Sequence, residues 1–159
     1  MSLQIVVQNI AQVEHGIIGH GVNCQGVMGS GVAHDLRSTY PQIFDSYIAK
    51  CNEQSKKRSL LLGKVDFVDI VKDDLIVANM FTQEYYGKDG KVYSSPLAIY
   101  QSLLRVILKA SEKKLDIYIP QIGCGLGGLS WDDNVLPLIE ELLALFPEVN
   151  IIVCNLPNK

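Results

Sequence analysis

The chain has 159 residues, of which 48% are hydrophobic and 19% are charged, and this composition favours one compact domain over residues 1–159. Its net charge is −3 and its one noticeable basic run, residues 56–58, is short, so we expect no DNA partner. The four cysteines form no CxxC pair, which argues against a disulfide framework. We find no signal-peptide pattern and no stretch near the roughly 20 apolar residues of a membrane span, and we therefore expect a cytoplasmic, intracellular protein with no membrane partner.

The first third of the chain is predicted to contain two strands followed by helical segments. Apolar runs over residues 3–7 and 16–22 predict buried strands. A helix is predicted to begin near residue 29 or 30, after a glycine-rich loop, and to end or break at Pro41. Apolar residues over 43–48 continue as another amphipathic turn or two.

The middle of the chain is predicted to form a strand pair and a loop. Residues 60–70 and 75–81 predict strands joined by a hairpin-like turn at 72–74. The run 75–81 is apolar on both faces, which predicts a central position in the sheet. Residues 82–95 are predicted to form a surface loop.

The last third is predicted to alternate helices and strands. Ser94 or Ser95 can cap a helix with Pro96 in its first turn, and Ser130 can cap a second helix. Strands are predicted over 115–121 and 149–154, with a glycine loop over 123–128 after the first of them. This alternation predicts an α/β sandwich with helices on both faces of the sheet.

Two glycine loops follow predicted strands and are the candidate ligand-binding segments. The first lies in HGVNCQGVMGSGVAHDL, residues 20–36, and the second is GCGLGG, residues 123–128. Ligands of such sheets bind where strands pass into loops, and the unpaired N–H groups at a helix start suit an anion. An ordinary glycine-rich turn explains the first loop alone equally well, but two such loops at one crevice would favour a phosphate or diphosphate site.

Other chemistries fit these residues less well. The GCGLGG loop matches a dinucleotide fingerprint in spacing but lies too late in the chain, and neither loop continues into the Gly-Lys-Ser/Thr of a nucleotide-phosphate loop. A metal held by His20, Cys24 and Cys124 lacks recognisable zinc spacing. A cysteine nucleophile paired with His20 remains a minority alternative. His20 is either a core histidine or, at a strand end beside Asn23, a group that moves a proton at neutral pH.

The sequence resembles the macrodomain family of ADP-ribose-binding modules over nearly its whole length. The residues that carry the resemblance are the first strand ending in QNI (8–10), the loop HGVNCQGVMGSGVA and the segment PQIGCGLGGLSW (120–131). The stand-alone ADP-ribose 1″-phosphate phosphatases are the most similar branch, sharing the spacing of the first loop and LLGK at 61–64. The resemblance implies a three-layer α/β/α sandwich with a central mixed sheet of about six strands.

The resemblance also implies a set of site residues. Asn9 and Ile10 would lie near adenine, and His20 and Asn23 would carry the chemistry. The residues expected around the distal ribose and the phosphates are Gly29, Ser30, Gly31, Val32, Gly123, Cys124, Gly125, Leu126 and Gly127. No cofactor or metal is implied.

Two departures from the family pattern bear on activity. Asn9 stands where many macrodomains place Asp, so the adenine contact would lack charge assistance. The branch that removes ADP-ribose from acidic protein side chains uses a Lys and a second-loop Asp, where this chain has Gln83 and Gly127.

The resemblance leaves three functional hypotheses. The first is a metal-independent phosphatase of ADP-ribose 1″-phosphate, in which Asn23 fixes the ribose and His20 protonates the leaving oxygen or activates water. The second is a hydrolase of O-acetyl-ADP-ribose or of mono-ADP-ribosylated protein. The third is a non-catalytic reader or sink for ADP-ribose.

Overall fold

A mixed six-stranded sheet forms the centre of the molecule. The computed structural model describes residues 2–29 and 31–156. Within them the strand order is β1-β6-β5-β2-β4-β3, and every neighbouring pair is parallel except β3 with β4. The strands are β1 (Ser2–Val7), β2 (Gly16–Asn23), β3 (Val65–Val71), β4 (Leu75–Gln83), β5 (Ile117–Ile119) and β6 (Asn150–Asn155). The predicted mixed sheet is confirmed.

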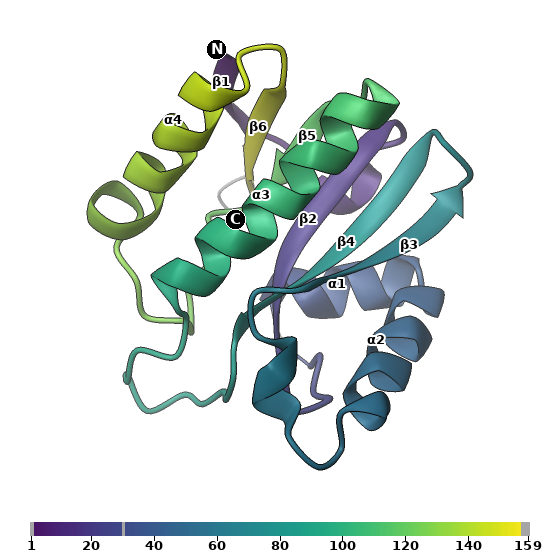
Figure 1. Cartoon of the computed structure of the whole chain (residues 1–159), viewed down its shortest axis with the longest axis vertical. Helices are drawn as coiled ribbons and strands as arrows, with labels where there is room; N and C mark the ends of the chain where they lie inside the picture. The colour runs from purple at the N-terminus through teal and green to yellow at the C-terminus, as the bar shows by residue number, and fades with distance from the viewer. Residues whose placement is uncertain (1, 30, 157–159) are drawn as a thin grey trace.

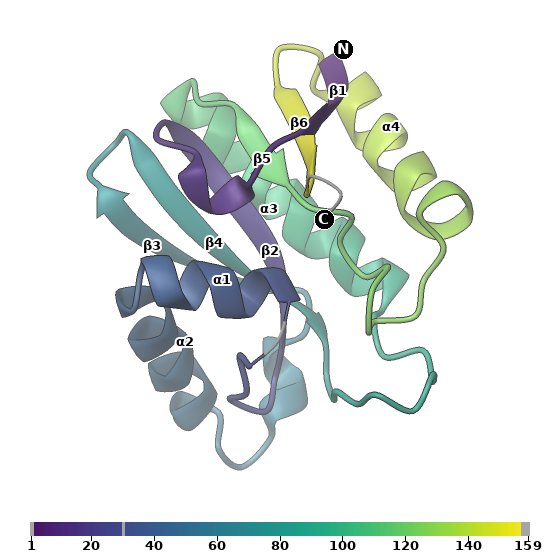
Figure 2. The same ribbon diagram turned by 180° about the vertical axis from the view of Figure 1, so that it is seen from behind.

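Helices cover both faces of this sheet, as Figures 1 and 2 show from opposite sides. Helices α3 (Pro96–Lys113) and α4 (Leu136–Leu145) lie on one face, and α1 (Gly31–Thr39) and α2 (Gln42–Glu53) lie on the other. Each interface buries its own apolar cluster, so the core has two halves separated by the sheet. The predicted three-layer sandwich is therefore confirmed.

Strand β4 lies inside the sheet, between β2 and the edge strand β3, and its side chains are buried on both faces. From Leu75 to Thr82 every residue of this strand is buried, which is the pattern expected of a strand covered by helices on both sides. It pairs with β2 on one edge and with β3 on the other, and the reversal at Asp73 has a positive φ of 62°. The predicted turn at 72–74 is confirmed, and the strand predicted to be central lies inside the sheet, one place from its edge.

The structure differs from the sequence prediction at two places between α1 and β3. Residues 43–48 are part of the twelve-residue helix α2, which is longer than the predicted turn or two. The predicted break at Pro41 is confirmed, because α1 ends at Thr39 and Pro41 precedes the first residue of α2. Residues 58–61 form the short 3₁₀ turn η2 (Arg58–Leu61), so the third strand begins only at Val65. An apolar leucine run does not distinguish a strand from a buried 3₁₀ turn.

The helix starts in the second half follow their capping residues. The Ser95 hydroxyl accepts a hydrogen bond from the Ala98 N–H at 3.1 Å, and the Ser130 hydroxyl accepts one from Asp133 N–H at 3.3 Å. After Ser130 the chain makes the wider π-helical turn η3 (Trp131–Val135) before α4 begins. Among the helices that the structure describes, none combines the length and apolarity needed to cross a bilayer.

Candidate ligand site

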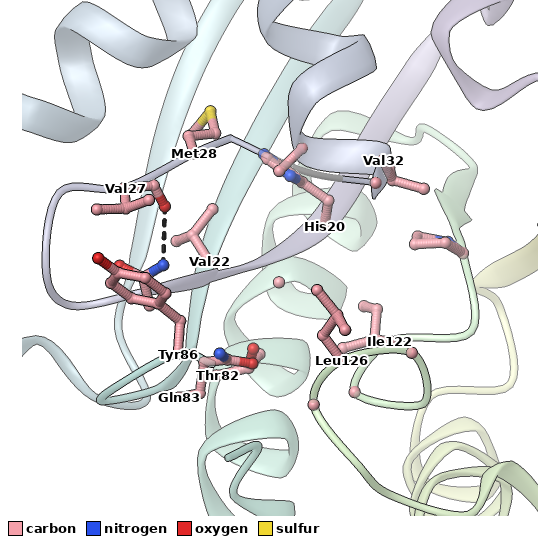
Figure 3. A pocket seen from close by; sticks show the side chains of 18 of the residues that line it. His20, Val22, Val27, Met28, Val32, Thr82, Gln83, Tyr86, Ile122 and Leu126 are labelled. Carbon is pink, nitrogen blue, oxygen red and sulfur yellow. Dashed lines mark hydrogen bonds between the residues drawn. The ribbon is translucent and has the colours of Figure 1, made fainter. Parts of the chain in front are cut away.

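A cavity of about 540 Å³ lies at the carboxyl ends of three neighbouring parallel strands, β5, β2 and β4. Its walls come from β2 and the loop after it, the start of α1, the end of β4 with the loop after it, and the loop after β5 (Figure 3). The volume lies in the range of small-molecule sites, and the position is where open α/β sheets bind ligands.

Both predicted glycine loops border this one cavity. From the first loop and the start of α1 it is lined by Gly29, Gly31 and Val32, and from the second by Gly123, Gly125, Leu126 and Gly127. His20 and Asn23 also line it, whereas Ser30 falls outside the described residues. The two turns therefore come together as the sequence predicts.

The second loop offers unbonded main-chain amides to the cavity. Within the described chain, no hydrogen-bond acceptor is found for the N–H groups of Gly125, Leu126 and Gly127, while the Cys124 N–H is used in a turn to Gln121 O at 3.2 Å. Clustered amides of this kind form an anion site without any positive side chain. That property suits an acidic protein that holds phosphates.

Three predicted site residues are not among the residues that line the cavity. The Asn9 side-chain oxygen accepts from the Ala11 N–H at 3.0 Å and caps the 3₁₀ turn η1 (Ile10–Gln12), in which Ile10 is buried. The Cys124 thiol lies 3.4 Å from Ile122 O and packs against the core. These side chains are used for local structure, and the ligand contacts that the resemblance implies for the three residues stay predictions.

His20 belongs to a buried hydrogen-bonded chain beneath helix α2. Its Nε2 lies 2.6 Å from Asn79 Oδ1 on the neighbouring strand. The Asn79 amide nitrogen faces Ile43 O at 3.1 Å and Asp66 Oδ2 at 3.3 Å, both of which only accept hydrogen bonds. Asn79 must therefore turn its oxygen to His20, so His20 Nε2 carries the proton and Nδ1 is a bare acceptor.

The environment of His20 bears on the two roles that the sequence leaves open for it, a core histidine or a group that moves a proton. The side chain is 1% exposed, and burial lowers its pKa to about 4 from the usual 6.5, against the opposing effect of the Asn79 hydrogen bond. The imidazole is therefore neutral at pH 7 and has no proton at Nδ1 to give to a leaving oxygen. Nδ1 makes no hydrogen bond within the described residues, and in this tautomer it can only accept one.

The first loop uses most of the hydrogen-bonding groups of Asn23. Its Nδ2 donates to Val27 O at 2.7 Å (Figure 3), and its Oδ1 accepts from the Gln25 N–H at 2.9 Å. The Tyr47 hydroxyl lies 2.8 Å from the same Oδ1 and 2.7 Å from Asn23 O. Asn23 thus holds the loop in shape and keeps one amide hydrogen for a ligand.

Comparison with known proteins identifies the family. The Macro domain family profile matches residues 20–136. The chain belongs to the Macro domain family. This family binds ADP-ribose and includes hydrolases that act on its derivatives.

Individual relatives of this macrodomain carry two different activities in their names. It is 33% identical over 143 residues to an ADP-ribose 1″-phosphate phosphatase of Saccharomyces cerevisiae, which covers 74% of this chain and 79% of that protein. It is 29% identical over 134 residues to a DNA ADP-ribosyl glycohydrolase of Mycobacterium tuberculosis, covering 83% of this chain and 36% of that protein. The chain therefore spans about a third of the mycobacterial relative. The solved macrodomain protein of Streptomyces coelicolor is 26% identical with a TM-score of 0.80, covering 98% of this chain and 100% of that one.

In this macrodomain Gln83 and Gly127 are joined through Ser94. The Ser94 hydroxyl donates to Gln83 Oε1 at 3.0 Å, and the Ser94 N–H donates to Gly127 O at 3.1 Å. A Cβ on Gly127 would lie 2.7 Å from Gly123 O and would collide with the Ser94 hydroxyl. The second loop therefore has no room for a carboxylate side chain at this position.

The cysteines of this macrodomain lack the features of a nucleophile. Cys24 is fully buried, and burial raises the pKa of its thiol to about 12. Burial also raises the pKa of Cys124. Both thiols stay protonated at neutral pH, which removes the reactive thiolate that the minority alternative requires. Within the described chain, no three His, Cys, Asp or Glu side chains gather closely enough to hold a metal ion.

The first loop is held from behind by helix α2, and this contact gives a testable stability effect. Tyr47 is fully buried, and its hydroxyl also accepts from the Gly26 N–H at 3.0 Å. We expect Tyr47→Phe to lower the free energy of unfolding by about 1–3 kcal/mol, because buried polar groups of the loop lose their partner. Urea unfolding measures this change.

Tyr100 provides the matched control for that measurement. It is half-buried on α3, and its hydroxyl makes no hydrogen bond within the described part of the chain. Tyr100→Phe should change the unfolding free energy by less than about 0.5 kcal/mol. Equal effects of the two substitutions would show that the Tyr47 hydroxyl does not support the first loop.

Proposed function

We propose that this macrodomain is a hydrolase that converts ADP-ribose 1″-phosphate and water into ADP-ribose and inorganic phosphate. The observation that carries the proposal is the single cavity between the two glycine loops, with unbonded amides at Gly125, Leu126 and Gly127. Amides fixed in this way can bind the diphosphate of the substrate without a positive side chain. The identity to the yeast phosphatase over three quarters of the chain supports the same assignment.

The replacement of Lys and Asp by Gln83 and Gly127 favours this reaction over removal of ADP-ribose from a macromolecule. Cleavage of a glycosidic or ester link to a macromolecule gains from acid–base groups beside the distal ribose. Here Gln83 is bonded to Ser94, and Gly127 leaves no space for a carboxylate.

The residues of the first loop would act by binding and orientation. Asn23 keeps the loop closed through Val27 and retains one amide hydrogen toward the cavity, where a ribose hydroxyl can accept it. The Nδ1 atom of His20, a residue that also lines the cavity, is a buried acceptor without a hydrogen-bond partner in the described part of the chain. Because His20 is neutral near pH 7, it positions groups by accepting hydrogen bonds and does not donate protons.

Phosphate release from ADP-ribose 1″-phosphate by the purified protein tests the proposal. We expect release of inorganic phosphate that needs no added metal, and no release of ADP-ribose from modified DNA or from modified protein. O-acetyl-ADP-ribose belongs in the same panel. The assignment fails if the protein binds ADP-ribose but releases no phosphate, which would identify a reader, or if the macromolecular substrates are turned over instead.

A further inference from the structure

The loop after β4 contributes one wall of the cavity. Tyr86, Gly87 and Lys88, which lie in the segment between β4 and α3, all line it. In Figure 3, Tyr86 lies on the side of the cavity formed by Val27 of the first loop, and Leu126 of the second loop lies on the other side. Lys88 follows Tyr86 by two positions and lines the same cavity.

Both ends of this loop are held in place. At its start, the Gln83 side chain donates to Tyr85 O at 2.7 Å. At its end, the Tyr93 N–H donates to Gly127 O at 2.9 Å, and the Ser95 N–H donates to Thr82 O at 2.8 Å. The loop is thus bonded to both β4 and the second glycine loop, so Lys88 is carried on an anchored segment and not on a free tail.

Lys88 is the only formally charged side chain among the described residues that line the cavity. The nearest acid in sequence, Asp89, is already engaged by the Tyr93 hydroxyl at 2.8 Å and by the Lys91 ammonium at 3.8 Å. No ion pair of Lys88 is found within the part of the chain that the structure describes. Its ammonium charge is therefore available to a ligand.

We propose that Lys88 binds the phosphate on C1″ and so determines the preference of this site for a phosphorylated over an unphosphorylated distal ribose. The inference rests on the proposed function and adds the group that separates substrate from product. The main-chain amides of the second loop serve the diphosphate, which is common to ADP-ribose and ADP-ribose 1″-phosphate. Only the additional phosphate needs a further cation, and loss of that phosphate weakens the hold on the product.

The test compares two ligands in four proteins. Parent, Lys88→Ala, Lys88→Arg and Lys91→Ala are assayed for phosphate release from ADP-ribose 1″-phosphate, and their binding of that substrate and of ADP-ribose is measured by calorimetry. We expect Lys88→Ala to raise KM about tenfold, the loss of one charge-assisted hydrogen bond, with ADP-ribose affinity within about twofold of parent. Lys88→Arg should recover most of the loss, and Lys91→Ala, which removes a cation outside the cavity lining, should match parent.

The binding arm separates failure of this inference from failure of the proposed function. If the parent releases no phosphate, the proposed function fails, yet tighter binding of ADP-ribose 1″-phosphate than of ADP-ribose, lost in Lys88→Ala, still supports the role of Lys88. If Lys88→Ala weakens both ligands equally, or neither, the role of Lys88 is overturned whether or not the protein is an enzyme. A fall in kcat alone with unchanged KM would also overturn it.

Discussion

Replacing Gly125 by valine is expected to abolish ADP-ribose binding while leaving the fold intact. Gly125 lines the cavity, and a Cβ built on it meets no atom within 4 Å. A valine side chain is therefore accommodated by the protein itself but occupies the volume over the second loop that the diphosphate needs. Loss of two amide–phosphate hydrogen bonds corresponds to a rise in Kd of about 100-fold or more, measured by calorimetry.

Unfolding measurements distinguish blockage of the cavity from damage to the loop. The unfolding free energy of Gly125→Val should stay within about 1 kcal/mol of parent. Gly29→Val, on the first loop, also enters open space and should also lose binding. Gly127→Val should lose both binding and stability, because its Cβ meets Gly123 O at 2.7 Å. Normal ADP-ribose binding by Gly125→Val would mean that the diphosphate does not lie against the second loop.

Acidification from pH 6.5 to pH 4 is expected to lower the free energy of unfolding through His20. The pKa of His20 is about 4 in the folded protein because the ring is buried, against 6.5 when it is exposed. Between these values the unfolded chain binds a proton that the folded chain does not, so stability falls as the pH falls. The difference between the two pKa values corresponds to about 3 kcal/mol of unfolding free energy. Urea unfolding at a series of pH values can follow this change.

Two histidine variants assign that pH dependence. His20→Gln keeps an amide N–H for Asn79 but cannot titrate. The fall in unfolding free energy between pH 6.5 and pH 4 should therefore be smaller in this variant. His15 is exposed, and its hydrogen bond to Asp74 raises its pKa, so its contribution is present at low pH and lost as the pH rises. His15→Gln should therefore still show the fall in unfolding free energy between pH 6.5 and pH 4. An unchanged pH slope in His20→Gln would contradict the burial of a neutral imidazole.

Two aspartates with lowered pKa values, Asp73 and Asp89, also contribute to the pH dependence of the unfolding free energy. The pKa of Asp73 is lowered by its hydrogen bond and ion pair with Lys113, and that of Asp89 mainly by its hydrogen bond from Tyr93. Their stabilising contributions are present above 3.8 and are lost only below it. Protonation of these two carboxyl groups therefore lowers the free energy of unfolding mainly at the acid end of the titration.

The position of the site could be predicted from the sequence because it depends on local patterns. Strand ends are marked by the glycine loops that follow apolar strands. Helix starts are marked within a few residues by the serines before Pro96 and Trp131. Once the strands are parallel neighbours, their carboxyl ends meet at one edge. The two loops that border the cavity follow from these signals alone.

The roles of single side chains could not be predicted, because they depend on residues far away in the chain. His20 bonds to Asn79, 59 positions later, and Asn23 bonds to Tyr47, 24 positions later. These pairings arise from strand register and from where α2 packs, which no local pattern encodes. They favour the core-histidine alternative for His20 and give Asn23 a loop-supporting role beside the ribose contact predicted for it.

Lys88 was missed for a related reason. It lies in a polar loop between β4 and α3 and has no motif around it, so the sequence gives it the appearance of an ordinary surface lysine. Its signal is its position beside the cavity, which follows from the contacts of the neighbouring Gln83 and Ser95. A count of charged residues in predicted loops near the strand ends would have put it among the candidates.

The support of the first loop by Tyr47 and Arg58 has a consequence for how a nucleotide is captured. Arg58 donates to Gln25 O at 2.7 Å from a separate turn, so the loop is fastened at two points outside the cavity before any ligand arrives. The loop is then ordered when the protein folds, so ordering it does not reduce the affinity for the ligand. We therefore expect association in a single diffusional step with no slow isomerisation, and the apparent melting temperature should rise with ligand concentration by mass action alone.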